Sequence, residues 1–399
     1  MDGKAAPPAK ADIRVAYLCD ISPLDPFPYS GGNARIYNAL KREFPDTSVL
    51  SQSWGMAEPV RRLIANLPPA LELRSRWRAH LLLSGLISRQ VERELAQGRY
   101  DVLFCAYSFH SLYRIQPPHP MTVVYTSDAT PTTYRNSAIG ESFGSYLKLS
   151  RHLDPLVLKA ETHTFRGADL LLWPSAWLKE QADPLYGLDP SRSHVVPWGA
   201  NVPAPGLKET PPRLTPDAPV HFLFVGRDWW AKGGPLTVET ITTLRNAGVD
   251  ARLTVVGCLP PDATPLQGDA LTVYPSLNKA DPEEMSLFQH LFESAHFMMM
   301  PSMESYGFAF CEASAYGLPS LCLNAGGVPV ESGVNGHALP LSATAQDYAA
   351  LIRSYLAAPD LYATLRQTTR QKYLDELNWS AWARTTADLI LSEIAAKRG

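Results

Sequence analysis

Short apolar runs alternate with longer amphipathic segments along the chain, and this alternation limits the folds open to it. Residues 13–19, 102–106, 122–126 and 170–173 are runs of strand length with little internal alternation of apolar and polar residues. Such runs suit the strands of a parallel sheet, because both faces of that sheet are buried. Helix-length segments lie between them, so the pattern predicts a doubly wound α/β domain.

The same rhythm restarts after a proline-rich segment. Residues 203–219 hold six prolines in 17 positions, which excludes a helix or a central strand and predicts a linker. Strands are then expected at 221–226, 252–257, 271–274 and 296–300, and helices at 235–247, 285–294 and 308–316. At 399 residues the chain is also too long for one ordinary core. We therefore expect two doubly wound, Rossmann-like domains facing a central cleft, with ligands outside the carboxyl ends of the strands.

These patterns predict a disordered tail at 1–11, an N-terminal domain at 12–202, the linker at 203–219 and a C-terminal domain at 220–379. The net charge of -3 does not favour nucleic acid as a partner. No apolar run is long enough to span a bilayer, and the N-terminus lacks the apolar core of a secretory signal. The five cysteines form no CxxC pair, which favours reduced thiols and a cytoplasmic location.

The densest set of functional residue types follows the predicted strand at 296–300. Gly307 permits a tight turn before a helix that begins at Phe308, and the first free amides of a helix bind anions. Glu304 and Glu312 lie eight residues apart, or roughly 12 Å along a helix. Retaining glycosidases hold their two carboxyl groups only about 5–5.5 Å apart. The spacing therefore suits the two ends of a longer ligand, whereas the simpler alternative is a loop–helix corner with solvated glutamates.

Residues 301–319 closely resemble the E-x7-E signature of family-4 glycosyltransferases, which are retaining enzymes with the two-domain GT-B fold. Phe224–Arg227 followed by Lys232 resembles the first strand and loop of the family's donor domain. Taken alone, that loop is equally consistent with solvated basic residues. The resemblance covers the C-terminal half well and the N-terminal half thinly. Further matching segments are 167–175, 194–201, 325–331, 335–336 and 378–380.

The resemblance implies transfer of a sugar from a nucleoside-diphosphate sugar to a hydroxyl acceptor with retention of configuration. Glu312 would hold the ribose, Glu304 the sugar, and Arg227 and Lys232 the diphosphate, whose leaving charge cationic side chains stabilise. In addition, the backbone amides of Phe308 and Ala309 would stabilise the diphosphate, and Gly307 would bind the donor through a close backbone approach. The family implies no metal and no other cofactor, and a terminal helix at 380–399 that packs back on the first domain.

In the N-terminal half, Gly31 and Gly32 resemble a family loop that approaches the diphosphate, although a plain turn explains them equally well. Asp128 departs from the family, because many relatives place a histidine there. A carboxylate can bind a sugar hydroxyl or accept a proton, and the alternative is a helix N-cap. Tyr274 or Leu277 is expected to contact the nucleotide base, unless both are core residues.

Residues 60–94 combine leucines and Trp77 with arginines. This composition fits either peripheral membrane contact or a helix pair packed on the domain with its arginines in water. The expected partners are therefore a nucleotide-sugar donor and a saccharide or lipid-linked acceptor, in surface polysaccharide or glycolipid assembly. Two other functions stay open: a non-catalytic nucleotide-sugar sensor, and a GT-B enzyme of other chemistry, such as an epimerase or a phosphorylase.

Overall fold

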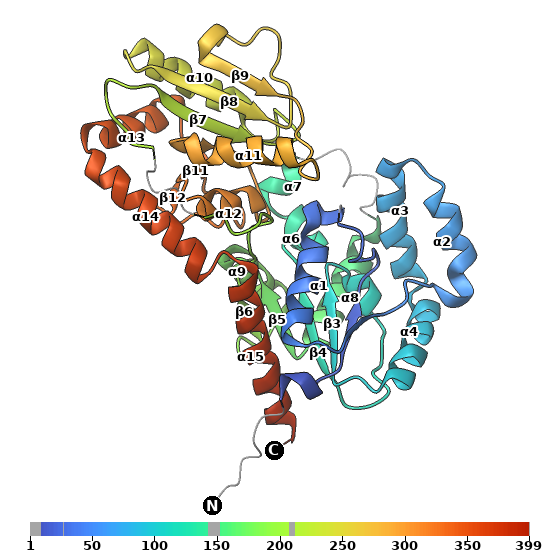
Figure 1. Ribbon diagram of the computed structural model, residues 1–399. Helices are drawn as coiled ribbons and strands as arrows, with labels where there is room; N and C mark the ends of the chain where they lie inside the picture. The colour runs from blue at the N-terminus through green and yellow to red at the C-terminus, as the bar shows by residue number, and fades with distance from the viewer. Residues whose placement is uncertain (1–8, 27, 143–151, 207–211, 399) are drawn as a thin grey trace, which may run out of the picture. The chain divides into compact units, whose positions relative to one another are not determined.

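The computed structural model describes residues 9–26, 28–142, 152–206 and 212–398 (Figure 1). The chain divides into two compact units. The first comprises residues 1–197 and 379–399, and the second comprises residues 198–378. Each unit has a parallel six-stranded sheet and a hydrophobic core of its own. The expected pair of doubly wound α/β domains is therefore confirmed.

The first unit is built on a parallel sheet with the strand order β2-β1-β3-β4-β5-β6. The order runs outward in both directions from β1 and β3, as in a doubly wound domain. Its strands are Val15–Leu18 (β1), Thr47–Val49 (β2), Val102–Ala106 (β3), Thr122–Thr126 (β4), Leu170–Trp173 (β5) and Ser193–Val195 (β6).

Helices connect the strands of the first unit, and the C-terminal helix α15 also belongs to this unit. Trp382 of α15 is buried and lies edge-on to Phe104 of β3, and α15 also packs against α1. The helices are Gly32–Glu43 (α1), Glu58–Ala65 (α2), Pro69–Leu82 (α3), Ser84–Gly98 (α4), Phe109–Leu112 (α5), Pro131–Arg135 (α6), Ala138–Ser142 (α7), Asp154–Gly167 (α8), Ala176–Tyr186 (α9) and Trp379–Arg398 (α15).

The second unit has the strand order β12-β11-β10-β7-β8-β9, again entirely parallel. Its strands are Val220–Val225 (β7), Ala251–Val256 (β8), Leu271–Tyr274 (β9), Phe297–Met299 (β10), Ser320–Leu323 (β11) and Gly336–Leu339 (β12). Its helices are Gly234–Asn246 (α10), Pro282–Ser294 (α11), Phe308–Ala315 (α12), Ala345–Ala357 (α13) and Pro359–Asp375 (α14).

The boundaries of the units differ in detail from those expected. The chain enters the second unit at Trp198, ahead of the proline-rich segment, and Leu214 within that segment is buried in the second core. At the N-terminus, residues 1–8 of the expected disordered tail lie outside the described residues, whereas Lys10–Asp12 forms a 3-10 helix. The strands β2, β6, β11 and β12 were not predicted, because each has only three or four residues, at least one of them polar, and gives no clear apolar run.

Candidate active site

The start of α12 is held in place by packing beneath it. Gly307 has φ 91°, and a Cβ there would lie 2.7 Å from the ring of Phe310, so the turn into the helix requires glycine. Phe308 stacks on the buried Trp198 with ring centroids 5.7 Å apart. The Tyr306 hydroxyl also donates a hydrogen bond to the Trp198 carbonyl at 2.7 Å. These contacts make the helix start a rigid platform.

Glu304 is held by groups from three segments. Its carboxylate accepts a hydrogen bond from the Ser302 hydroxyl at 2.8 Å and forms an ion pair with Lys232, 72 residues earlier in the chain. Its backbone carbonyl accepts a hydrogen bond from the Gly327 amide at 3.0 Å. The carboxylate is only 13% exposed, so its position is well defined.

The loop after β7 brings Lys232 to this position. The Asp228 carboxylate accepts the amides of Trp230 and Ala231, both at 2.9 Å, which orders the turn. Gly233 has φ 80°, and a Cβ there would lie 2.2 Å from the Pro301 carbonyl oxygen. The loop after β7 therefore lies directly against the loop after β10. Arg227 is exposed in this loop and, among the described residues, has neither a hydrogen bond nor an ion pair.

Glu312 forms a second ion pair one turn inside α12. Lys279 reaches its two carboxylate oxygens at 3.2 and 3.4 Å, and the lysine lies 4.2 Å from the centroid of the Phe288 ring. Glu312 is 5% exposed. The sequence did not single out Lys279; the only hint was its position in the loop after β9, where the base was expected.

Tyr274 ends the edge strand β9, and Leu277 follows it in the loop that leads to Lys279. Both side chains are half-buried. Among the described residues, the core of the second unit includes neither of them. The alternative that both are core residues is therefore not supported.

The second unit thus gathers four loops at the carboxyl ends of its parallel strands β7, β9, β10 and β11. Glu304 and Glu312 lie in this region, and each is paired with a lysine from another loop. Such an edge is where open α/β sheets bind ligands. Paired lysines near a helix start provide positive charge for a phosphate, and the glutamates provide acceptors for hydroxyl groups.

In the first unit, the Gly31–Gly32 loop is more constrained than a plain turn. Tyr29, Ser30 and Gly31 have successive positive φ angles of 54°, 54° and 82° before α1 begins at Gly32. Non-glycine residues adopt this conformation only when their surroundings impose it. Here the Tyr29 ring stacks on Tyr107 at 4.2 Å, and Tyr107 itself has φ 61°.

Asp128 lies half-buried two residues beyond β4. The helix that follows, α6, is capped by Thr130, whose side chain accepts the amide of Thr133 in a capping box. The simpler interpretation of Asp128 as the N-cap of this helix is therefore wrong. Its negative charge adds to the burial that raises the pKa of Tyr107.

A buried polar cluster around Asp20 escaped the sequence analysis. Asp20 follows β1, and its carboxylate accepts a hydrogen bond from the Ser108 hydroxyl at 2.7 Å and lies 3.2 Å from His110 Nε2. Burial alone would raise the pKa of Asp20, but the hydrogen bond and charge of His110, with Arg76 and Ser108, hold it well below its ordinary value. The signal that could have revealed it is an aspartate directly after the first strand.

The described residues contain no group of three or more His, Cys, Asp or Glu side chains arranged to hold a metal ion. None of their helices is long and apolar enough to cross a membrane.

Two family models match the chain, and together they span most of it. "Glycosyltransferase Family 4" matches residues 33–202, and "Glycosyl transferases group 1" matches residues 219–358. Among characterised proteins, glycogen synthases from two strains of Mycobacterium tuberculosis are 26% identical over 261 residues. The match covers 63% of this chain and 60% of the synthases, so it spans less than two thirds of their length.

Solved structures show the same fold along nearly the whole chain. Sucrose-phosphate synthase from Thermosynechococcus elongatus aligns with a TM-score of 0.64 at 17% identity, covering 96% of this chain and all of that one. WaaG, a glycosyltransferase of lipopolysaccharide biosynthesis, aligns at 0.60 and 16% identity, covering 95% and 99%. HepE from Anabaena in complex with UDP-glucose aligns at 0.58 and 14% identity, covering 95% and 100%. These alignments and the two parallel sheets show the GT-B fold. The two family models show that the chain belongs to the family-4 type of glycosyltransferases.

Proposed function

We propose that the protein transfers a sugar from a nucleoside-diphosphate sugar to a hydroxyl acceptor, with retention of the anomeric configuration. One observation carries the proposal: Glu304 and Glu312, on either side of the start of α12, are each held by a lysine from a different loop. HepE was solved with UDP-glucose, which supports a donor of this class for a chain of the same fold. Retention rests on the resemblance to family 4.

In this proposal the diphosphate competes with Glu304 for Lys232. Lys232 and Arg227 then neutralise the charge that develops as the bond between the anomeric carbon and the diphosphate oxygen breaks. The amides of Gly307, Phe308 and Ala309 add to this stabilisation, and Glu304 is released to accept a sugar hydroxyl. The acceptor oxygen forms its bond on the face that the leaving group vacates.

The remaining assignments extend the same proposal. Glu312 binds the ribose hydroxyls, and Tyr274 or Leu277 contacts the base. In the first unit, Asp128 is the candidate to bind a sugar hydroxyl or accept the acceptor proton, and Gly31 and Gly32 are candidate diphosphate contacts. Catalysis without a metal is proposed because cationic side chains supply the positive charge, so activity should survive excess EDTA.

The test begins with a thermal-shift panel of UDP-, GDP- and ADP-sugars, followed by assays of nucleotide release with and without sugar acceptors. A donor that binds only the folded protein raises its melting temperature by mass action. Lys232→Ala should lower kcat by about 100-fold or more, as expected for loss of a leaving-group contact. The matched control is Lys179→Ala, which breaks a lysine–aspartate pair in the first unit.

Each outcome bears on a different function. A donor shift with turnover that Lys232→Ala abolishes supports the transferase. A donor shift without turnover on any acceptor supports a nucleotide-sugar sensor, and turnover that needs inorganic phosphate supports a phosphorylase. No shift with any donor contradicts the proposed site.

We further propose a cytoplasmic enzyme that acts on a saccharide or lipid-linked acceptor of surface polysaccharide or glycolipid assembly and touches the membrane through residues 60–94. The exposed Leu63 and Leu71, on α2 and α3, support this contact. Replacing both with serine should reduce binding to anionic vesicles. Leu361→Ser, a change at an equally exposed leucine of α14, should leave binding unchanged.

A further inference from the structure

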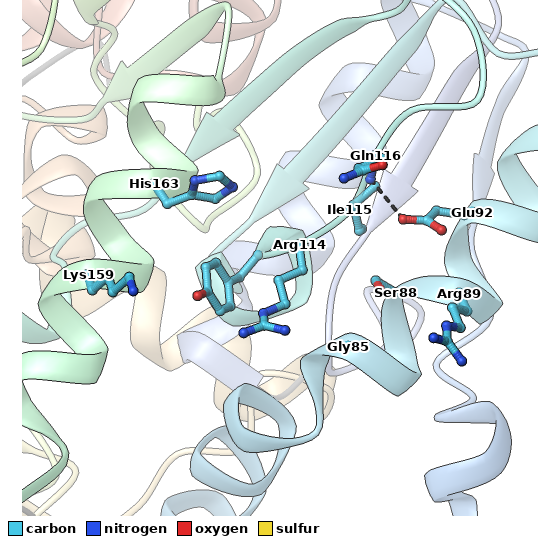
Figure 2. A pocket seen from close by; sticks show the side chains of 10 residues that line it. Gly85, Ser88, Arg89, Glu92, Arg114, Ile115, Gln116, Lys159 and His163 are labelled. Atoms are coloured by element: carbon cyan, nitrogen blue, oxygen red, sulfur yellow. Dashed lines mark hydrogen bonds between the residues drawn. The ribbon is translucent and has the colours of Figure 1, made fainter.

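A cavity of about 570 Å³ lies wholly within the first unit, apart from the residues assigned to the donor site (Figure 2). Its α4 residues belong to the segment 60–94 that is proposed above for membrane contact. Three segments line it: α4, residues 113–116 and α8. Figure 2 shows Lys159 and His163 of α8 pointing toward the segment that carries Arg114. Cavities of this size hold small organic ligands.

The lining of this cavity is positively charged. Arg89, Arg114 and Lys159 line it against a single carboxylate, Glu92. None of the three cations forms an ion pair with any residue that the structure describes. Glu92 is already occupied, because one of its oxygens accepts the Gln116 amide at 2.9 Å. Three exposed cations from three segments therefore line one cavity that has a single carboxylate, Glu92, in its lining.

Arg114 holds an uncommon backbone conformation at the edge of this cavity. Its backbone has φ 69°, a left-handed conformation that costs an arginine about 1 kcal/mol or more. Its guanidinium lies against the first turn of α4: a Cβ on Gly85 would be 3.4 Å from Arg114 Nη1, and Figure 2 shows the group directed toward Gly85. The first turn of a helix carries partial positive charge, and α4 has no side-chain cap. An anion between the Arg114 guanidinium and the first turn of α4 would compensate both positive charges.

We propose that this cavity is a binding site for a phosphate-bearing ligand. Arg114 and Lys159 contact the phosphate oxygens, and guanidinium and ammonium groups are the side chains best suited to them. The Tyr113–His163 pair, whose rings meet edge to face at 5.6 Å, forms a wall for the remainder of the ligand. The volume exceeds that of a lone phosphate, so a phosphorylated sugar, a diphosphate or a lipid phosphate headgroup fits this chemistry.

The test is calorimetric titration of the full-length protein with inorganic diphosphate and with a hexose phosphate. Because the proposed donor site also binds diphosphate, the titrations are made in a Lys232→Ala background as well. Arg114→Ala combined with Lys159→Ala should weaken by about 10-fold or more the binding that remains in that background. Arg93→Ala is the matched control, since it removes an exposed arginine of α4 that does not line the cavity.

A second experiment, with lipid vesicles, distinguishes a soluble phosphate compound from a lipid phosphate headgroup. Loss of soluble-ligand binding in the double variant identifies a soluble phosphate compound. Loss of flotation with phosphatidylglycerol vesicles, in a protein that binds no soluble probe, identifies a lipid headgroup. If the double variant behaves like Arg93→Ala in both arms, the proposal is overturned. Donor turnover, measured in parallel, keeps a failure of the proposed function separate from a failure of this site.

Discussion

Lys279 and Lys232 hold the two glutamates of the candidate site, but they have different expected effects on turnover. In the proposed mechanism Lys232 meets the leaving diphosphate, whereas Lys279 orients Glu312 at the proposed ribose end. An interaction made equally in the ground state and the transition state changes KM and leaves kcat unaltered.

We therefore expect Lys279→Ala to raise the KM for the donor about 10-fold and to change kcat less than threefold. Steady-state kinetics at varied donor concentration measures both constants. A large fall in kcat with an unchanged KM would contradict the role assigned to Lys279.

A second prediction at the residue scale concerns Glu161, which is buried on α8. Burial raises its pKa to about 7 from the ordinary 4.5, despite hydrogen bonds from the backbone amide and the hydroxyl of Thr132. The protonated form is thus favoured in the folded state. The resulting stabilisation is complete below about pH 4.5 and is lost as the pH rises through 7. The difference corresponds to roughly 3 kcal/mol at most.

Glu161→Gln keeps an acceptor for Thr132 and removes the titration. The melting temperature of the variant, relative to the unmodified protein, should therefore be higher at pH 8 than at pH 5, and melting curves at both pH values measure this. Asp347→Asn is the control, because Asp347 is an exposed capping carboxylate of α13. If the melting temperature of Glu161→Gln relative to the unmodified protein is the same at both pH values, the raised pKa of Glu161 is contradicted.

At the scale of elements, the function of α12 depends on the turn that starts it. Gly307→Ala places a Cβ at φ 91°, 2.7 Å from the Phe310 ring and 3.4 Å from Glu304 Cγ. We expect a loss of about 1–3 kcal/mol of stability and donor binding weakened about 10-fold or more, because the helix start and Glu304 must both shift.

The matched control is Gly248→Ala. Gly248 has a similar φ of 85°, but a Cβ there meets nothing within 4 Å. It should lose stability by backbone strain alone and bind the donor normally. Denaturant unfolding and thermal-shift titration separate the two effects, and parallel loss of donor binding in both variants would refute the role given to the turn.

At the scale of the whole molecule, the two units have separate sheets and separate cores. A ligand that binds one unit therefore need not slow hydrogen exchange in the other. The candidate donor residues that form ion pairs, Lys232, Lys279, Glu304 and Glu312, belong to the second unit. With donor at about 100 times its Kd, the bound state gains about 2.7 kcal/mol. Hydrogen exchange should therefore slow most in peptides covering 226–233 and 300–316. Stronger protection from exchange around β1 and β3 than in these peptides would contradict a donor site in the second unit.

The sequence alone determined the fold class and the central motif of the candidate site, because both depend on neighbours along the chain. Apolar runs such as 102–106 and 122–126 specify buried parallel strands, and the observed β3 and β4 have the same bounds. Glu304, Gly307 and Glu312 lie within nine residues, so a strand–turn–helix reading places them together without any knowledge of the rest of the molecule.

The tertiary structure alone decided which side chains hold these residues. Lys232 meets Glu304 across 72 residues, Lys279 meets Glu312 across 33, and His110 meets Asp20 across 90. The charged lining of the cavity likewise comes from three separate segments. Local patterns carry no information on such pairs, because strand order and loop packing determine which distant residues meet.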